Sequence, residues 1–236
     1  MINRKAREII LKALKEGRKH LLETEAKELI SLYGINVLKF KLARNLREAV
    51  KFSAEIGFPV VLKIVSPDIL HKSDVGGVFI DLSSSEDVKK AYRFIIRNIK
   101  RDCPGANIIG VLVEKMAKPG VEVIIGSLKD PQFGPTIMFG LGGVFVEILK
   151  DVSYRIAPLT RLDAMEMLKE IKGYKILRGY RNIKPRDERT LINFILSVSR
   201  LVVENEEIQQ LDLNPVVVYE KGAVVLDAKV VLESKG

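Results

Sequence analysis

The chain has 236 residues, of which 47% are hydrophobic and 29% are charged. This length suffices for one large or two small domains, and the composition excludes a disordered chain, a fibrous repeat and a miniature scaffold. No apolar run approaches the roughly 20 residues that a membrane-spanning helix needs, and the first 20 residues lack the pattern of a secretory signal. The single cysteine, Cys103, favours a reducing compartment, so we expect a cytoplasmic protein.

The net charge is +9, from 39 basic and 30 acidic residues. Such an excess raises the hypothesis of nucleic-acid binding, because clustered lysine and arginine neutralise phosphate backbones. The sequence has no tryptophan, however, and its other aromatic residues do not alternate with basic runs as base-stacking residues do. We interpret the two basic regions, the N-terminal helix and residues 169–189, as solvated surface. We therefore expect neither nucleic acid nor a membrane as a partner.

The first half of the chain predicts helices that alternate with strands. Residues 4–33 have helical periodicity that is interrupted near Gly17, and Gly34 stands where a helix would end. The elements expected next are a strand at 37–42, a helix opened by Asn45 and Glu48, strands at 59–65 and 78–82, a helix opened by Ser84 and Asp87, and a strand at 108–115. Two successive β-α-β units predict a split, ferredoxin-like subdomain.

The second half predicts another α+β subdomain. The expected elements are strands at 121–127 and 136–139, a glycine-rich turn, helices at 163–172 and 187–204, and strands at 210–219 and 223–231. Glu220-Lys221-Gly222 between the last two strands predicts a tight hairpin. The fold class is therefore α+β with two subdomains. Because no low-complexity linker separates them, we expect a hinge near residue 115.

The last hairpin predicts a metal site. Alternation along the strand places Asp212 and Asn214 on one face, and in both registers of a two-residue loop Asp227 shares that face. Three oxygen donors without histidine or thiolate suit Mg²⁺. The alternative is an exposed sheet face with ordinary polar alternation, and a bulge or a longer loop would move Asp227 away.

A lysine and a histidine are further candidates for a phosphate site. Lys63 lies in an otherwise apolar strand, where a charge needs an anionic partner; the alternative is an edge-strand lysine that blocks aggregation. The loop that follows ends in Gly76 and Gly77, whose backbone amides are able to approach a phosphate. His71 at the centre of this loop is a candidate base or phosphoryl acceptor, although a loop histidine is more often plain surface.

Taken in chain order, these residues resemble an ATP-grasp protein: Lys63, the His71 loop, Glu114-Lys115-Met116, Glu122, the turn 140–143, and Asp212-Leu213-Asn214-Pro215 with Asp227. Two longer stretches are similar to the β subunit of ADP-forming acetyl-CoA synthetases, and the likeness extends over roughly residues 20–232. They are Ser66-Pro67-Asp68-Ile69-Leu70-His71-Lys72-Ser73-Asp74-Val75-Gly76-Gly77-Val78 and Asp130-Pro131-Gln132-Phe133-Gly134-Pro135. The β subunit of succinyl-CoA synthetase has a comparable Asn-Pro and Asp pair but lacks this histidine-bearing sequence.

The resemblance implies an ATP-grasp fold in three parts. A helical segment, 1–34, would join an α+β body, 114–236, that ends in the metal-binding hairpin, and residues 35–113 would form a ferredoxin-like lid. ATP or ADP would be bound by Lys63, Gly76, Gly77, Glu114, Lys115, Met116 and Glu122, with Glu114 to Met116 as the hinge beside the adenine. Mg²⁺ would be held by Asn214 and Asp227, with Asp212 as a further ligand or close neighbour.

The activity that the resemblance implies is the nucleotide half-reaction of a reversible acyl-CoA synthetase. His71 would take phosphate from a histidine of a separate α subunit and pass it to ADP. That α subunit would carry the CoA-binding and acyl-transfer parts in an α2β2 heterotetramer, so this chain alone would be incomplete. The alternatives are a β subunit like that of succinyl-CoA ligase and a non-catalytic nucleotide-sensing subunit. The low glutamine content and abundant lysine, glutamate and isoleucine are typical of a thermophile.

Overall fold

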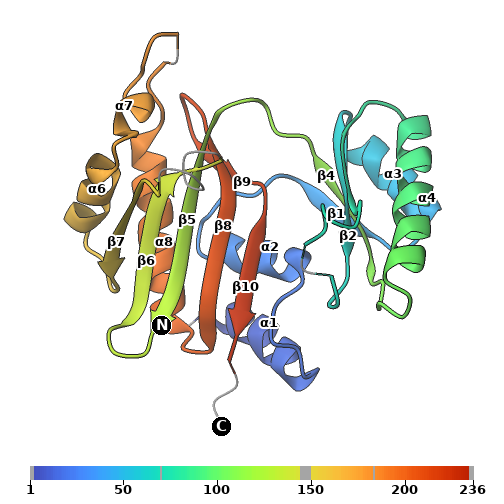
Figure 1. Cartoon of the computed structure of the whole chain (residues 1–236), viewed down its shortest axis with the longest axis horizontal. Coiled ribbons are helices and arrows are strands. Elements are labelled where there is room, and N and C mark those ends of the chain that lie inside the picture. The colour runs from blue at the N-terminus through green and yellow to red at the C-terminus, as the bar shows by residue number, and fades with distance from the viewer. Residues whose placement is uncertain (1–2, 70, 144–149, 183, 234–236) are drawn as a thin grey trace. The chain divides into compact units, whose positions relative to one another are not determined.

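The computed structural model describes residues 3–69, 71–143, 150–182 and 184–233. The chain divides into two compact units, which we treat separately (Figure 1). The small unit is Leu38–Lys118, and the large unit joins Met1–Val37 to Pro119–Gly236. No helix among the described residues is both long enough and apolar enough to cross a membrane.

The small unit is a four-stranded antiparallel sheet with two helices. Its elements are β1 (Phe40–Ala43), α3 (Leu46–Ile56), β2 (Val60–Val65), β3 (Val78–Leu82), α4 (Ser85–Asp102) and β4 (Gly110–Lys115). The strands are ordered β1-β4-β2-β3. Strand β4 thus separates β1 from β2, and β2 separates β3 from β4, so both β-α-β units are split as the sequence predicts. Strand β1 begins three residues later than expected.

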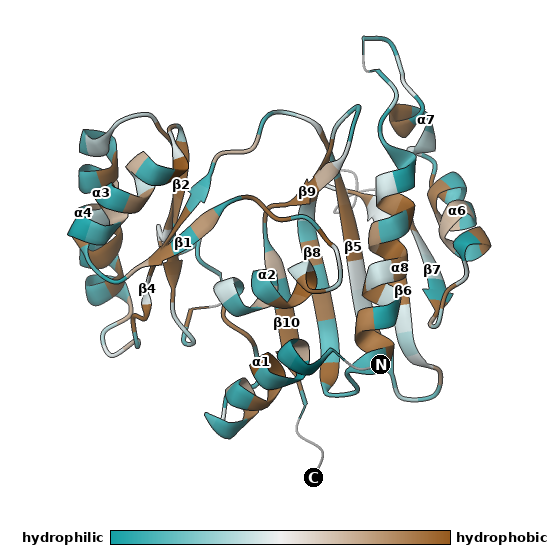
Figure 2. Ribbon diagram, turned by 180° about the vertical axis from the view of Figure 1, so that it is seen from behind, coloured by the Kyte–Doolittle hydropathy of each residue, from teal (hydrophilic) through white to brown (hydrophobic). Residues whose placement is uncertain are grey.

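Both helices of the small unit begin at the predicted capping residues. The Asn45 side chain accepts a hydrogen bond from the Glu48 N–H at 2.9 Å, and the Ser84 hydroxyl accepts one from the Asp87 N–H at 3.1 Å. Each helix is amphipathic, as Figure 2 shows for α4, and buries its apolar stripe on one face of the sheet. The residues of this core include Ala49, Val88, Ile95, Ile99, Leu62, Ile64, Val111 and Val113.

The large unit is built on a six-stranded antiparallel sheet. Its strands are β5 (Val121–Asp130), β6 (Gly134–Leu141), β7 (Val152–Ile156), β8 (Ile208–Val218), β9 (Ala223–Val225) and β10 (Ala228–Leu232). Their order is β10-β8-β5-β6-β7, and β9 pairs with the end of β8. The described helices are α1 (Arg4–Lys15), α2 (Glu23–Ser31), α6 (Arg161–Glu170), α7 (Tyr174–Leu177) and α8 (Glu188–Glu204).

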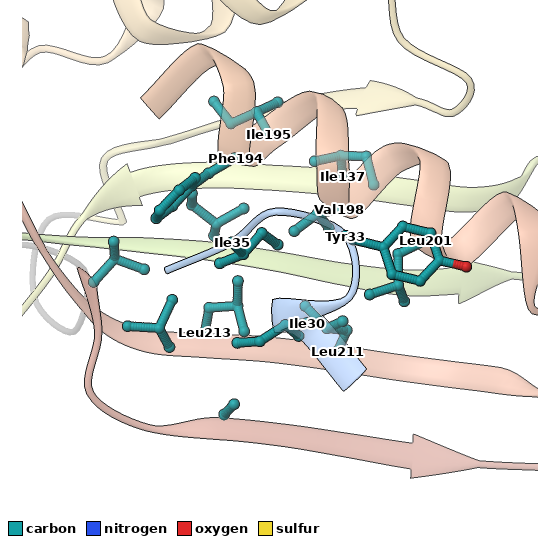
Figure 3. Packing of buried hydrophobic residues seen from close by; sticks show 14 of the residues in the cluster. Ile30, Tyr33, Ile35, Ile137, Phe194, Ile195, Val198, Leu201, Leu211 and Leu213 are labelled. Carbon is teal, nitrogen blue, oxygen red and sulfur yellow. The ribbon is translucent and has the colours of Figure 1, made fainter. Parts of the chain in front are cut away.

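Helices α2 and α8 cover one face of the large sheet, α2 over β10 and α8 over β5 and β6. Figure 3 shows Ile30, Tyr33 and Ile35 meeting side chains of α8 and β8, which contribute Phe194, Ile195, Val198, Leu201, Leu211 and Leu213. Because Leu211 and Leu213 point into this core, Asp212 and Asn214 project from the opposite face of the sheet. The core therefore sets the orientation of the predicted metal ligands.

Three details of the large unit differ from the sequence predictions. Strand β7 was not expected, and the predicted strand 223–231 is two strands, interrupted at Leu226 and Asp227. The predicted start of α6 at Asp163 is wrong by two residues, because Thr160 is the N-cap and Asp163 is the third helical residue of a capping box. At the other end of the chain, the break near Gly17 allows either two helices or one kinked helix, and residues 4–33 form two helices.

Candidate functional site

Strands β8 and β10 bring the three predicted metal ligands to one face of the large sheet. Strand β8 pairs with β9 and then with β10 in a single register, so Asn214 lies directly opposite Asp227. The Asn214 N–H donates to the Asp227 carbonyl oxygen at 3.2 Å, and the Leu226 N–H donates to that of Pro215 at 3.0 Å. This is the register predicted for a Glu220-Lys221 loop, and it is confirmed. We call Asp212, Asn214 and Asp227 the metal face.

The electrostatics of the metal face fit a divalent cation. Burial raises the pKa of Asp212, and the charge of Asp227 raises it further, whereas Lys229, directly opposite Asp212, lowers it. Asp212 Oδ1 is buried and has no hydrogen-bond donor among the described residues. Asp227 Oδ1 accepts a hydrogen bond from the Ala228 N–H at 3.0 Å. Two carboxylates and an amide oxygen, one of them a buried oxygen without a donor, suit Mg²⁺. The described residues contain no cluster of three or more His, Cys, Asp and Glu that could hold a metal ion. The predicted set has only two carboxylates, and its third oxygen would be that of the Asn214 amide.

A pocket that the sequence did not indicate opens beside Asp212. Its volume is about 360 Å³, and β5, β6, β7 and β8 line it with Ile124, Gly126, Ser127, Leu128, Asp130, Thr136, Met138, Tyr154, Gln210, Leu211 and Asp212. Gly126 is the direct partner of Asp212 on β5. A Cβ at Gly126 would lie 3.3 Å from Met138 Cε, so a larger residue would crowd the pocket floor. The available signal was the alternation along β5, which puts Gly126 on the face of Asp212.

In the small unit, Lys63 and Glu114 form an ion pair across strands β2 and β4. The Lys63 Nζ lies 3.1 Å from Glu114 Oε2, and the residues are only 8% and 2% exposed. The edge-strand explanation of Lys63 is wrong, because β2 is paired on both sides. The required anionic partner is present within the chain, and sequence reasoning had assigned Glu114 only to the hinge. Both side chains project from the sheet face opposite the helices.

The remaining hinge residues are fixed by hydrogen bonds. The Lys115 ammonium donates to the carbonyl oxygens of Gly57, at 2.9 Å, and Phe58, at 2.7 Å. The Met116 N–H donates to the Pro59 carbonyl oxygen at 3.2 Å. The Lys115 side chain is therefore engaged in holding the end of β4 against the loop that precedes β2. Glu114 and Lys115 are the last two residues of β4, which places them in the small unit.

His71 is exposed in the loop that joins β2 to β3, and its neighbour Leu70 lies outside the described residues. The end of this loop is held firmly. The Gly77 N–H donates to the Lys72 carbonyl oxygen at 2.7 Å, and the Gly77 carbonyl oxygen accepts from the Ile64 N–H at 2.8 Å. A Cβ on Gly77 would come within 2.5 Å of Ile64 Cγ2, so only glycine fits there.

This arrangement changes the interpretation of the glycine pair. The Gly76 N–H also donates within the loop, at 3.1 Å to the Ser73 carbonyl oxygen. Both amides that the sequence offered to a phosphate are thus already used for hydrogen bonds. In this conformation the pair anchors the His71 loop to β2, and a phosphate contact through these amides would require the loop to rearrange.

Glu122 stands beside the glycine-rich turn of the large unit. It is exposed in β5, and its carbonyl oxygen accepts a hydrogen bond from the Gly142 N–H at 2.8 Å. A Cβ on Gly142 would lie 3.1 Å from that of Glu122. The turn therefore passes close to the Glu122 backbone, and the carboxylate is presented at the rim of the sheet.

Comparison with known proteins adds a family context. The chain matches the model of an ATP-grasp domain over residues 12–232. It is 54% identical over 228 residues to the β subunit of ADP-forming acetate–CoA ligase I of Pyrococcus furiosus, with 97% of this chain and 98% of that protein covered. It is 46% identical over 228 residues to the ADP-forming 4-hydroxybutyrate–CoA ligase of Nitrosopumilus maritimus, with 96% of this chain but only 33% of that protein covered.

The chain is also similar to solved structures of acetyl-coenzyme A synthetases. The dinucleotide-forming acetyl-coenzyme A synthetase 1 of Candidatus Korarchaeum cryptofilum, in complex with coenzyme A, Ca-AMPCP and HgCl⁺, is similar with a TM-score of 0.95 and 57% identity, covering 97% of this chain and 100% of that chain. Another structure of that enzyme holds coenzyme A and Mg-AMPPCP, and its phosphohistidine segment points towards the nucleotide-binding site. Its TM-score is 0.86 at 55% identity, with the same coverage of both chains.

Proposed function

Since the chain belongs to the ATP-grasp family that comprises the β subunits of ADP-forming acetate–CoA ligases, we propose that it carries out the nucleotide half-reaction, in which a phosphohistidine at His71 passes its phosphate reversibly to ADP. The observation that carries this proposal is the pairing of Asn214 with Asp227, beside a buried Asp212 oxygen that lacks a donor. It supports a magnesium site on this hairpin, and phosphoryl transfer to ADP requires a divalent cation. We take the small unit as the lid and the large unit as the body of the fold.

The proposed roles follow from the demands of phosphoryl transfer, which needs positioning and charge neutralisation more than covalent help from the protein. Asn214 and Asp227 would hold Mg²⁺, with Asp212 as a third ligand or neighbour, and the ion would neutralise phosphate oxygens when bound. Lys63 would contact the nucleotide phosphates, while Glu114 keeps its ammonium in place. These roles rest on the buried Lys63 and Glu114 of the small unit and on the Asp212 oxygen of the large unit that has no donor among the described residues.

His71 would serve as the phosphoryl carrier. Its imidazole nitrogen would take the phosphoryl group from the α-subunit phosphohistidine; the P–N bond then breaks as an ADP β-phosphate oxygen forms the new P–O bond, and the electron pair returns to the imidazole. An exposed histidine in a loop that is anchored at Gly76 and Gly77 suits this task, because the side chain is accessible while the loop end stays fixed. The similar Korarchaeum enzyme has a phosphohistidine segment that points towards its nucleotide-binding site, which supports phosphohistidine chemistry in a relative of this chain.

We further propose that an α subunit supplies the CoA-binding and acyl-transfer parts, in an α2β2 assembly. The name of the Pyrococcus relative, a β subunit, implies such a partner, and the Nitrosopumilus relative is about three times as long as the part that matches this chain. That longer relative is named for 4-hydroxybutyrate rather than acetate. A similar ATP-grasp part thus occurs with different acids, which supports acid selection outside this chain.

The deciding experiment mixes the chain and its α subunit with acetyl-CoA, labelled phosphate and Mg²⁺ but no ADP. We expect acid-labile label on His71 by mass spectrometry, and its release as labelled ATP once ADP is added. His71→Asn should abolish the label, whereas His20→Asn, a change of the other histidine, should keep it. A phosphorylated α subunit with unlabelled His71, in a complex that still makes ATP, would show direct transfer to ADP and contradict the role of His71. ADP binding with no labelled phosphate on His71 or on the α subunit would instead indicate a nucleotide sensor.

A further inference from the structure

Lys229 shares the sheet face of the predicted metal ligands. It lies on β10 directly opposite Asp212 and two residues after Asp227, so alternation along the strand directs its side chain to the metal face. The row across three strands is Lys229, Asp212 and Gly126. An ammonium, a carboxylate and a position without a side chain are therefore neighbours on this surface.

The Lys229 ammonium acts on Asp212 only through its charge and has no close partner in the described part of the chain. It is half-buried and makes neither a hydrogen bond nor an ion pair with any described residue, including Asp212 opposite it. The other lysines buried beside carboxylates do form close pairs: Lys27 with Glu23 at 3.0 Å and Lys63 with Glu114 at 3.1 Å. Lys229 therefore does not neutralise Asp212 through a close ion pair.

A divalent cation bound at the metal face would change the electrostatic surroundings of Lys229. When the carboxylates of the metal face turn to the cation, Lys229 is left as a second positive charge close to it, and the two repel each other. An arriving anion relieves that repulsion by contacting both. Room for it exists, because Gly126 has no side chain and the pocket of about 360 Å³ opens beside Asp212. A lysine stem is long enough to cross one strand spacing of about 4.8 Å.

We propose that Lys229 binds an oxygen of the phosphoryl group in transit, next to the metal ion held by Asn214 and Asp227. This inference rests on the proposed function and extends it by one phosphate-binding residue. Lysine acts here as a point charge that follows the moving phosphoryl group, whereas Lys63 contacts the nucleotide phosphates. The ligand class is a phosphate or phosphoryl group that is already in contact with a divalent cation.

A direct test uses the full chain, Mn²⁺ and inorganic phosphate, and compares Lys229→Gln and Lys229→Arg with the exposed control Lys221→Gln. Mn²⁺ binding to Lys229→Gln should stay equal or become up to about threefold tighter, because a repelling charge has gone. Phosphate binding, followed by ³¹P relaxation near Mn²⁺, should weaken about tenfold or more, with Lys229→Arg in between. Weaker Mn²⁺ binding with unchanged phosphate binding would overturn the proposal.

A second measurement separates this inference from the proposed function. In the complex with the α subunit, transfer from labelled His71 to ADP should slow about 10- to 100-fold in Lys229→Gln, with a smaller change in the KM for ADP. If the wild-type complex transfers phosphate and Lys229→Gln does so equally fast, only this inference fails. If the wild-type complex transfers none, the proposed function fails, and the Mn²⁺ and phosphate measurement still decides whether Lys229 binds phosphate.

Discussion

The pair of Lys63 and Glu114 places two opposite charges in contact at a buried site. Glu114→Gln removes the negative charge but keeps the shape, so Lys63 is left buried without its ion pair. We expect the free energy of unfolding to fall by about 2 to 4 kcal/mol, because an unpaired buried charge costs more than the pair contributes. Urea unfolding of the full chain measures this change, with Glu55→Gln, an exposed partner of Lys41, as the control.

The double variant Lys63→Met with Glu114→Gln completes this test. It removes both charges, so it should recover part of the lost stability, since a buried pair and an apolar replacement are often nearly equal in free energy. If the double variant is no more stable than Glu114→Gln alone, the ion pair is not what the single substitution breaks. Nucleotide binding should be weakened in the double variant in either case, because the proposed phosphate contact is gone.

The same residues show what the sequence contained and what it lacked. The apolar neighbours of Lys63 indicated either an anionic partner or an edge-strand position, and only the pairing of β2 on both sides decides between them. The identity of the partner was not predictable, because it depends on which strand lies beside β2, and β4 lies far along the chain. Gly76 and Gly77 are the converse case. The two glycines are evident in the sequence. The reason why Gly77 must be a glycine is its close packing against Ile64, which only the folded structure shows.

Helix α8 is tied to the hairpin of the metal face by one carboxylate. Asp187 Oδ2 accepts hydrogen bonds from the Thr190 hydroxyl at 2.9 Å and the Gly222 N–H at 2.7 Å, and Oδ1 accepts one from the Thr190 N–H at 3.0 Å. Burial alone would raise the pKa of Asp187, but these bonds outweigh it and lower the pKa. A lowered pKa in the folded state means that ionised Asp187 stabilises the fold at neutral pH.

Asp187→Asn keeps one acceptor oxygen but removes the charge, so it should lower the free energy of unfolding at pH 7 by about 1 kcal/mol, because hydrogen bonds to a charged acceptor are roughly twice as strong as neutral ones. The difference from wild type should persist above the unfolded-state pKa, about 3.9, and shrink as the pH falls through the lower folded-state value. Urea unfolding at several pH values between 7 and 3 measures this. Asp163→Asn, a cap residue of α6 without a bond to another element, is the matched control. A difference that stays constant with pH would contradict the role of the charge.

Among the helices and strands, the sequence predicted best those features that depend on residues close together in the chain. The capping residues of α3 and α4 were predictable, and the register of the last hairpin was narrowed to two, with a Glu220-Lys221 or a Lys221-Gly222 loop, since each depends on residues close in sequence. Strand β7 was missed because it lies at the sheet edge with Tyr154 and Ile156 more than half exposed, so it lacks a clear apolar pattern. The break between β9 and β10 was missed because β8 continues past it and keeps the register.

At the scale of the molecule, the fold class followed from the order of elements, because two β-α-β units and a later run of strands leave few other arrangements. The place of residues 1–34 in the body was implied only by the resemblance and not by any local pattern. It depends on bridges that only the folded chain has, such as His20 with Val231 and Val37 with Val225. The N-terminal helices thus complete the core under the strands that carry the metal face.

The proposed division of labour between two subunits predicts which ligands stabilise this chain alone. A ligand that binds only the native state raises stability by about 2.7 kcal/mol at 100 times its Kd. We expect Mg-AMPPCP to raise the Tm of the isolated full chain, and coenzyme A or acetyl-CoA to leave it unchanged, because in the proposed division their binding parts belong to the α subunit. Differential scanning calorimetry measures both.

Two variants make this result specific. Asp227→Asn should remove most of the shift that Mg-AMPPCP produces, because it takes a charge from the metal face, while Asp102→Asn, an exposed residue at the end of α4, should keep it. A Tm that rises equally with coenzyme A would place CoA binding in this chain and contradict the division. A rise with Mg-AMPPCP that survives Asp227→Asn would leave nucleotide binding intact but move the metal away from the hairpin, because a cation held there depends on the carboxylate opposite Asn214.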